Sequence, residues 1–163
     1  MKPAYAGILL TLAACAAAPQ GSVARDSKPA VAAGATALRV EHGWMHSAPQ
    51  GQFETWAFAN ILNLGKTDAL VSADSPDCGS MVLRAATLTD AGRKMRSVAS
   101  IPIAAQDSVA LSVDGYFIAC IEARHALVAG QTLTATLHFA SGANVAATFL
   151  VSEGEGDPAD RGN

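Results

Sequence analysis

The segment TLTATLHFASGANVAATFLV, residues 132–151, decides the fold of this chain. In its first half, apolar side chains stand at every second position: Leu133, Ala135, Leu137 and Phe139. After Ser141-Gly142 the same spacing returns at Val145, Ala147, Phe149 and Val151. A period of two is that of a β-strand with one buried face, and two such runs joined by a short glycine-containing connection form a hairpin. The segment therefore predicts two antiparallel strands that share one apolar face.

Outward from this hairpin, the chain shows the same period in shorter runs. These runs lie at residues 38–46, 55–63, 69–74, 81–88, 95–103, 108–113 and 116–123. Turn-forming groups such as Ser75-Pro76-Asp77 separate them. Many short strands at this spacing predict an all-β fold, an antiparallel Greek-key β-sandwich.

Length and composition exclude several classes of protein. The chain has 163 residues, which is the length of one domain. It is 50% hydrophobic and only 15% charged, so it is too apolar to be disordered throughout. Its net charge of −3 lacks the basic excess of general nucleic-acid binders, and no nucleic-acid partner is expected. Since the chain has no nucleophile elbow, HExxH, Cys-x-x-Cys or phosphate-binding glycine loop, we do not expect an enzyme.

The N-terminus reads MKPAYAGILLTLAAC, with Lys2 before an apolar run at residues 8–14. This run is too short to remain as a membrane-spanning helix, and it is typical of an export signal. It ends in LAAC, residues 12–15, which resembles a bacterial lipobox, in which cleavage precedes a lipid-carrying cysteine. An ordinary signal peptide cut nearby is the alternative, and either one exports the protein. We expect a periplasmic protein anchored to a membrane through Cys15, and Ala16, in place of an Asp, favours the outer membrane.

These features divide the chain into four parts. Residues 1–14 are the predicted lipoprotein signal peptide, and residues 15–36 are the lipidated cysteine and a flexible tether rich in Ala, Gly, Pro and Ser. Residues 37–151 form the predicted sandwich. Residues 152–163 form an acidic tail that we expect to be disordered.

Two cysteines, Cys78 and Cys120, remain in the predicted sandwich. In an oxidising compartment, an even pair usually forms a disulfide. The chain-entropy model gives such a bridge about 4 kcal/mol of stabilisation for a loop of this length. Two buried thiols and a thiolate metal pair are the alternatives.

A series of markers stands in a characteristic order within residues 38–151. They are Val40 to Trp44, Ala57-Phe58, Asn63, Gly65, Asp68 to Val71, Ser75-Pro76, Lys94-Met95-Arg96, Gly115-Tyr116 and Thr134 to Phe139. In this order and spacing they resemble the periplasmic copper chaperone domain, PCu(A)C. The resemblance implies a cupredoxin-like β-sandwich, and a role in copper delivery toward cytochrome oxidase assembly or in copper buffering.

The resemblance also implies a set of metal ligands, most of which this chain lacks. The family binds copper through a His, a Met and a later His-x-Met, and imidazole and thioether groups suit Cu(I). By position, the Met falls on Met95, whereas the two His positions fall on Arg84 and Phe117 and the last Met position on Ala119. Phe and Ala have no lone pair for a metal, and Arg is a fixed cation. We therefore expect a degenerate site, with no cofactor bound there.

A second candidate copper site lies in the motif EHGWMH, with His42, Met45 and His46. On a strand, the two imidazoles share a face but lie about 13 Å apart. They meet only if the chain bends, for example at Gly43. Otherwise they are solvent-facing histidines beside a buried Trp44.

A third candidate is a soft metal site built from Cys78, Cys120, Met95 and His125. Neighbouring residues on a strand point to opposite faces, so Cys120 points away from the side that carries Ala119. This geometry favours the disulfide over the thiolate site.

The basic residues Arg84, Arg93, Lys94 and Arg96 form one more group. They are either a solvated hairpin or a pocket for an anion or for an acidic patch of a partner.

Two functions follow from these observations. The first is an exported lipoprotein with a copper-chaperone-like domain in the setting of periplasmic copper handling. The second is a structural or protein-interaction module that uses the rim around Arg84 and Met95. We interpret the chain as the lipoprotein, with its family metal site lost.

Overall fold

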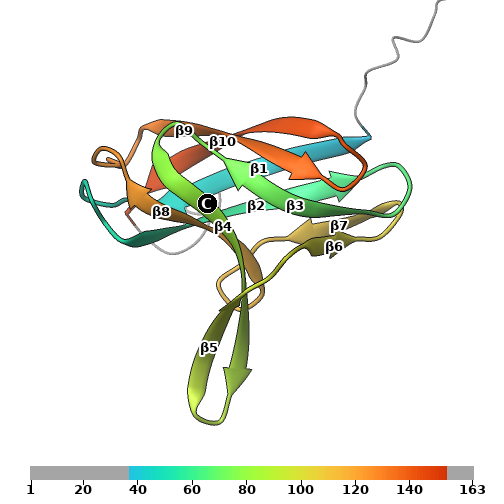
Figure 1. Ribbon diagram of the computed structural model, residues 1–163, viewed down its shortest axis with the longest axis horizontal. Helices are drawn as coiled ribbons and strands as arrows, with labels where there is room; N and C mark the ends of the chain where they lie inside the picture. Colours follow the sequence, from blue (N-terminus) through green and yellow to red (C-terminus); the bar gives the residue numbers. More distant parts are fainter. Residues whose placement is uncertain (1–36, 154–163) are drawn as a thin grey trace, which may run out of the picture. The chain divides into compact units, whose positions relative to one another are not determined.

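The computed structural model describes residues 37–153. The predicted leader, the tether with Cys15 and all but the first two residues of the predicted tail lie outside the described residues. The described part contains ten strands. They are β1 (Leu38–His46), β2 (Glu54–Asn63), β3 (Asp68–Asp74), β4 (Cys78–Thr89), β5 (Gly92–Ser97), β6 (Ile101–Ile103), β7 (Asp107–Ala110), β8 (Tyr116–Ala123), β9 (Thr132–Phe139) and β10 (Asn144–Ser152) (Figure 1). In this part of the chain, no helix is long and apolar enough to cross a membrane.

The strands are hydrogen-bonded in the order β5-β4-β8-β2-β1-β10-β9-β3-β6, and β7 pairs with β2. The predicted all-β sandwich is confirmed, and all but one of its strand pairs are antiparallel. The exception is the parallel pair of β1 and β10. No turn joins these two strands, and only a tight hairpin connection imposes antiparallel pairing.

The predicted single run at residues 95–103 is wrong, because the structure divides it between β5 and β6. These two strands lie at opposite ends of the strand order, where β5 pairs with β4 and β6 pairs with β3. The chain leaves one edge at Ser97 and joins the other at Ile101. The apolar pattern does not show this change of partner, because Met95, which is 40% exposed, is the one apolar side chain of β5.

The apolar face of the predicted 132–151 hairpin lies in the main core. Leu137 and Phe149 are completely buried, and Leu133 and Val151 are nearly so. Residues from several other strands join them, including Met45, Ile61, Leu70, Ile103 and Ile118. All the described residues belong to one compact unit by their contacts, with this core inside it. A unit that contains its complete core can fold on its own.

Strand β1 is interrupted by a β-bulge between Glu41 and Trp44. His42 has a positive φ of 52°, which is uncommon for a residue with a side chain. A Cβ on Gly43 would lie 2.2 Å from the backbone oxygen of Thr148 on β10. Gly43 is therefore required by the close approach of the two backbones.

Candidate functional site

The four residues at which the resemblance places the family's copper ligands share one face of β4, β5 and β8. Arg84 is directly opposite Phe117 in the β4–β8 pair, and Met95 is opposite Ala86 in the β4–β5 pair. Cross-strand partners share a face, as do residues two apart on one strand. Arg84, Met95, Phe117 and Ala119 thus lie on the same side of the sheet, which is the arrangement that a shared site would require.

Two of these positions carry buried apolar side chains. Phe117 and Ala119 have no exposed surface, and they belong to a small cluster apart from the main core. We call this the aromatic cluster; its buried members are Trp44, Phe58, Ala86, Phe117 and Ala119. The Phe117 ring lies 5.3 Å from the Trp56 ring and 6.3 Å from that of Phe58, between ring centroids. These separations are typical of packed aromatic pairs.

The third position carries an ion pair. Arg84 Nη2 lies 2.7 Å from Glu54 Oε2, and Arg84 Nη1 donates a hydrogen bond to Ser97 Oγ at 3.0 Å. The other carboxylate oxygen of Glu54 accepts a hydrogen bond from Trp56 Nε1 at 2.9 Å. Both charged side chains are about four-fifths buried, with exposed fractions of 23% for Arg84 and 19% for Glu54. The Arg84 guanidinium is thus held by the Glu54 carboxylate, whose other oxygen accepts a hydrogen bond from Trp56.

These residues do not fit a copper ion. The guanidinium of Arg84 is a permanent cation, and neither Phe117 nor Ala119 can donate an electron pair. Met95 keeps its thioether, with 40% of its surface exposed, but it has no partner ligand at the other three positions. Within residues 37–153, no group of three or more His, Cys, Asp or Glu side chains could hold a metal.

The residues of the EHGWMH motif are separated by the alternation of β1. Met45 is completely buried in the main core. His46 lies on the opposite side, where its ring packs 5.2 Å from Trp44 and 5.7 Å from Phe58. His42 lies at the β-bulge and is exposed. The structure therefore does not bring the thioether and the His46 imidazole to one point.

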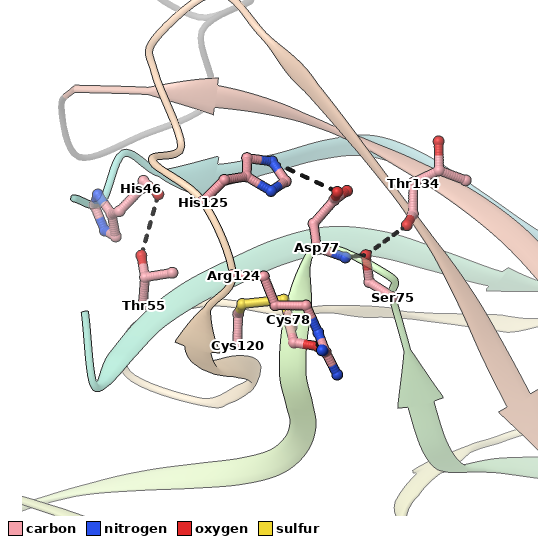
Figure 2. Close-up of a disulfide and its surroundings, with 9 residues drawn as sticks. All are labelled: His46, Thr55, Ser75, Asp77, Cys78, Cys120, Arg124, His125 and Thr134. Carbon is pink, nitrogen blue, oxygen red and sulfur yellow. Dashed lines mark hydrogen bonds and ion pairs between the residues drawn. A yellow bond between two sulfur atoms is a disulfide. The ribbon is translucent and has the colours of Figure 1, made fainter. Parts of the chain in front are cut away.

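The predicted disulfide between Cys78 and Cys120 is confirmed (Figure 2). Their Cα atoms lie 5.5 Å apart, and both residues are buried in the main core. The alternative soft site with Met95 and His125 is wrong, because the two sulfurs are bonded to each other and cannot serve as thiolates. The bridge links the start of β4 to β8.

The basic group is divided between the two faces of the β4–β5 hairpin, which projects from the rest of the strands in Figure 1. Arg93 faces the same side as Met95 and Arg84, whereas Lys94 and Arg96 face the other side. Arg93 also pairs with Asp114 at 2.6 Å. The four cations therefore do not form one pocket.

Two histidine–aspartate pairs were not predicted from the sequence. His138 Nε2 contacts Asp74 Oδ1, and its Nδ1 lies 2.7 Å from Asn144 Oδ1. The hydrogen bond with Asp74 raises the pKa of His138 above its ordinary value. His125 Nε2 lies 3.5 Å from Asp77 Oδ1. The partners in each pair are many residues apart in sequence, so only the strand pairing could have revealed them.

Comparisons with known proteins agree with the fold. Among solved structures, the apo PCuAC domain from PmoF1 has a TM-score of 0.61 and 24% identity, over 72% of this chain and 94% of that one. The copper-bound PCuAC domain from PmoF2 has a TM-score of 0.58 and 18% identity, over 72% and 93%. CuI-DR1885 from Deinococcus radiodurans in solution has a TM-score of 0.56 and 26% identity, over 76% and 85%. The resemblance to PCu(A)C domains and the cupredoxin-like fold are confirmed.

A search of curated proteins found no match. A family model described as "Putative lipoprotein LpqE-like" matches residues 38–151, which is all but the first residue of the predicted sandwich. The chain belongs to the LpqE-like family.

Proposed function

We propose that the chain is an exported, lipid-anchored protein whose copper-chaperone-type domain holds no copper at the family's ligand positions. The lipobox-like LAAC at residues 12–15 and the family's lipoprotein description support the anchor. The copper-bound neighbours support the setting, periplasmic copper handling or oxidase assembly. The domain keeps the architecture of a copper chaperone and acts through its surface.

One observation carries this proposal: the 2.7 Å ion pair of Arg84 and Glu54 stands where a first ligand would be. A cation fixed by a largely buried carboxylate repels a second cation, and its removal would leave the carboxylate without its charge partner. Phe117 and Ala119 complete the loss, because the space on their side is filled by packed rings. Copper entry would require breaking both the ion pair and the aromatic cluster.

A Cu(I) competition titration tests this proposal, with a chromogenic chelator and the unit Gly34–Asn163. We expect the wild-type unit to take no copper from the chelator. The variants Met95→Ala and His42→Ala/His46→Ala serve as controls, and we expect them to match the wild type. Tight one-to-one binding by the wild type would contradict the proposal, and the variant that lost it would identify the ligands.

A second function, docking of a partner protein, is favoured by the β4–β5 hairpin. Leu88 is 74% exposed and Met95 is 40% exposed, and both lie on the face that also carries Arg93. An exposed apolar pair on a projecting hairpin suits a partner with an apolar patch. In cells, a photo-crosslinker at position 88 should capture a defined partner protein. The control is the same crosslinker at Leu64, which is 51% exposed and lies in the connection between β2 and β3, and it should not capture that partner. Identical products from both positions would contradict docking on the hairpin.

A further inference from the structure

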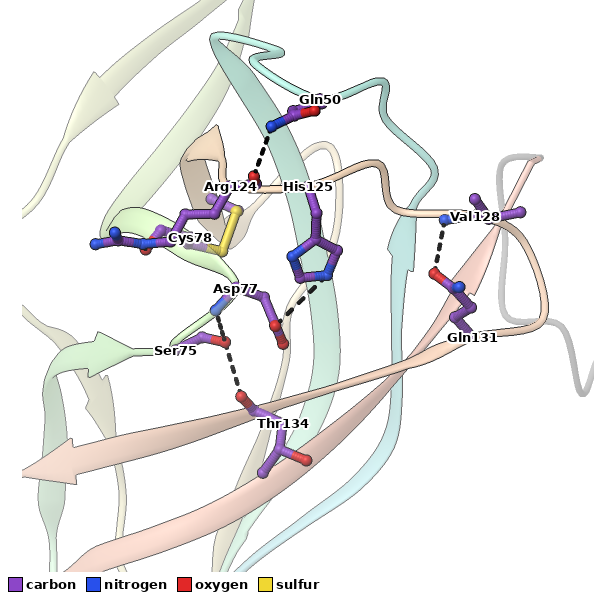
Figure 3. A network of polar contacts seen from close by, with 10 residues as sticks. Gln50, Ser75, Asp77, Cys78, Arg124, His125, Val128, Gln131 and Thr134 are labelled. Carbon is purple, nitrogen blue, oxygen red and sulfur yellow. Dashed lines mark hydrogen bonds and ion pairs between the residues drawn. A yellow bond between two sulfur atoms is a disulfide. The ribbon is translucent and has the colours of Figure 1, made fainter.

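A groove of about 430 Å³ lies beside the disulfide, at the end of the domain where β4 begins. Its lining includes the side chains of Asp77 and His125, with Leu127, Leu133 and Val151 as the apolar part. In Figure 3 the His125 ring points toward the Asp77 carboxylate. A carboxylate and an imidazole thus converge at the rim of an open space.

Hydrogen bonds fix the backbone at Asp77 and at Arg124, the residue before His125. The Asp77 N–H donates to Ser75 Oγ at 3.3 Å, and the Ser75 hydroxyl donates to the Thr134 carbonyl at 2.8 Å. The Arg124 N–H donates to the Asp77 carbonyl at 2.9 Å, so the residues before β4 and after β8 are tied directly.

Side chains and the disulfide strengthen this link. Arg124 Nε donates to the Cys78 carbonyl at 3.0 Å, and Gln50 Nε2 donates to the Arg124 carbonyl at 3.1 Å (Figures 2 and 3). The Cys78–Cys120 bridge joins the same two strands covalently. The backbone that carries the pair is therefore ordered before a ligand binds, which lowers the entropic cost of binding.

The spacing of the pair suits a shared ion better than a direct hydrogen bond. His125 Nε2 and Asp77 Oδ1 are 3.5 Å apart, which exceeds the roughly 2.7–3.2 Å of a normal N–H···O bond. An ion about 2.0–2.1 Å from each atom, at a tetrahedral angle, separates its two ligands by about 3.3–3.4 Å. The side chain of His125 is 55% exposed and that of Asp77 is 26% exposed, so the remaining coordination positions of the ion would face the groove.

The other pair, His138 and Asp74, does not have this freedom. Both ring nitrogens of His138 are engaged, one by Asp74 and one by Asn144. Metal binding by His138 Nε2 and Asp74 would break the hydrogen bond that already joins them. The two pairs contain the same chemical groups, so the His138 pair is a matched control for the His125 pair.

We propose that Asp77 and His125 form an open site for a divalent transition-metal ion, Zn²⁺ or Cu²⁺, with water or a partner's ligands completing the coordination. Imidazole and carboxylate are ordinary ligands of Zn²⁺ and Cu²⁺, and neither of these two ligands selects for Cu(I). The site is separate from the family's ligand positions, and it does not depend on the proposed function.

The test is a titration of the ¹⁵N-labelled unit Gly34–Asn163 with ZnCl₂, followed by NMR of the histidine ring nitrogens and backbone amides. We expect the His125 ring and the amides of Asp77 and Arg124 to shift together to one saturating equivalent. Asp77→Asn, which keeps the size of the side chain, and His125→Ala should each weaken binding about tenfold or more. His138→Ala should leave the affinity unchanged. Repeating the titration with Cu²⁺ should broaden the same signals.

The proposal is overturned if Zn²⁺ leaves the His125 ring unshifted, or if Asp77→Asn and His125→Ala bind as tightly as the wild type. Thermal unfolding and the amide spectrum of each variant establish that it is folded. Shifts confined to the His138 ring, or to the acidic residues after 153, would equally contradict the assignment.

Discussion

The ion pair between Glu54 and Arg84 should contribute measurably to stability, and a double-mutant cycle can isolate its contribution. Glu54→Ala removes one carboxylate that accepts hydrogen bonds from Arg84, at 2.7 Å, and from Trp56, at 2.9 Å. Arg84→Leu removes the cation and also its buried Nε, which has no hydrogen-bond partner among the described residues. The two changes therefore have unequal costs.

The magnitudes follow from burial. A hydrogen bond to a charged group contributes about 1.5–3 kcal/mol, and partial exposure places this pair near the lower end. We expect Glu54→Ala to lower the free energy of unfolding by about 2–3 kcal/mol, because it strands a guanidinium that is 23% exposed. Arg84→Leu should cost about 1 kcal/mol, because Glu54 keeps its hydrogen bond from Trp56 Nε1 and the change also removes the unpartnered Nε of Arg84. The coupling between the two sites should be about 1–2 kcal/mol.

The assay is urea unfolding of the wild-type unit Gly34–Asn163, both single variants and the double variant, followed by tryptophan fluorescence. Trp56 contacts Glu54 directly, so its emission in the folded state reports on the pair as well. If the two single-variant costs add to within about 0.5 kcal/mol of the double variant, the pair contributes no net interaction. Arg84 and Glu54 would then not form a stabilising ion pair in place of the first ligand.

Three further outcomes are expected. Replacing Cys78 and Cys120 by Ser should lower the free energy of unfolding by about 4 kcal/mol, because the bridge closes a loop between residues 42 positions apart. Chemical denaturation measures this loss. Gly43→Ala should cost more than about 2 kcal/mol, because its Cβ would overlap a β10 carbonyl; thermal unfolding near the wild-type value would contradict this. The hydrogen bond with Asp74 raises the pKa of His138, so this pair stabilises the fold fully below pH 6.5, and the gain disappears as pH rises through the raised pKa. His138→Gln should therefore lose more stability at acid pH than at about pH 9.

The alternation of apolar residues was sufficient to predict most of the strands. Hairpin 132–151 is correct because both its strands keep a period of two and Gly142 takes the positive φ of the turn. The disulfide was also predictable, since Cys120 lies on the core side of β8 while its neighbour Ala119 lies on the other side. The hairpin depends on residues near one another in sequence, and the disulfide on there being two cysteines to pair within the predicted sandwich.

The parts that could not be predicted depend on which strands become neighbours. Glu54 on β2 reaches Arg84 on β4 across β8, and nothing local in the sequence connects the two residues. The same holds for Asp77 with His125, which meet because β4 and β8 are paired. The division of the basic group on β5 was accessible from alternation alone, because Arg93 and Lys94 are adjacent and must face opposite sides.

The central claim is that three residues, and not the fold, separate this domain from copper binding. Restoring the family's ligand types at those positions tests it most directly, in the triple variant Arg84→His/Phe117→His/Ala119→Met with Met95 intact. A matched variant carries the same changes together with Met95→Ala. Circular dichroism and thermal unfolding establish that both are folded before the Cu(I) competition titration.

We predict that the triple variant binds one Cu(I) ion, that the variant without Met95 binds it more weakly, and that the wild type binds none. Tight binding by the wild type would contradict the account. A folded triple variant that binds no copper would contradict it equally, because the shared face of β4, β5 and β8 would then not be the ligand site that the resemblance implies.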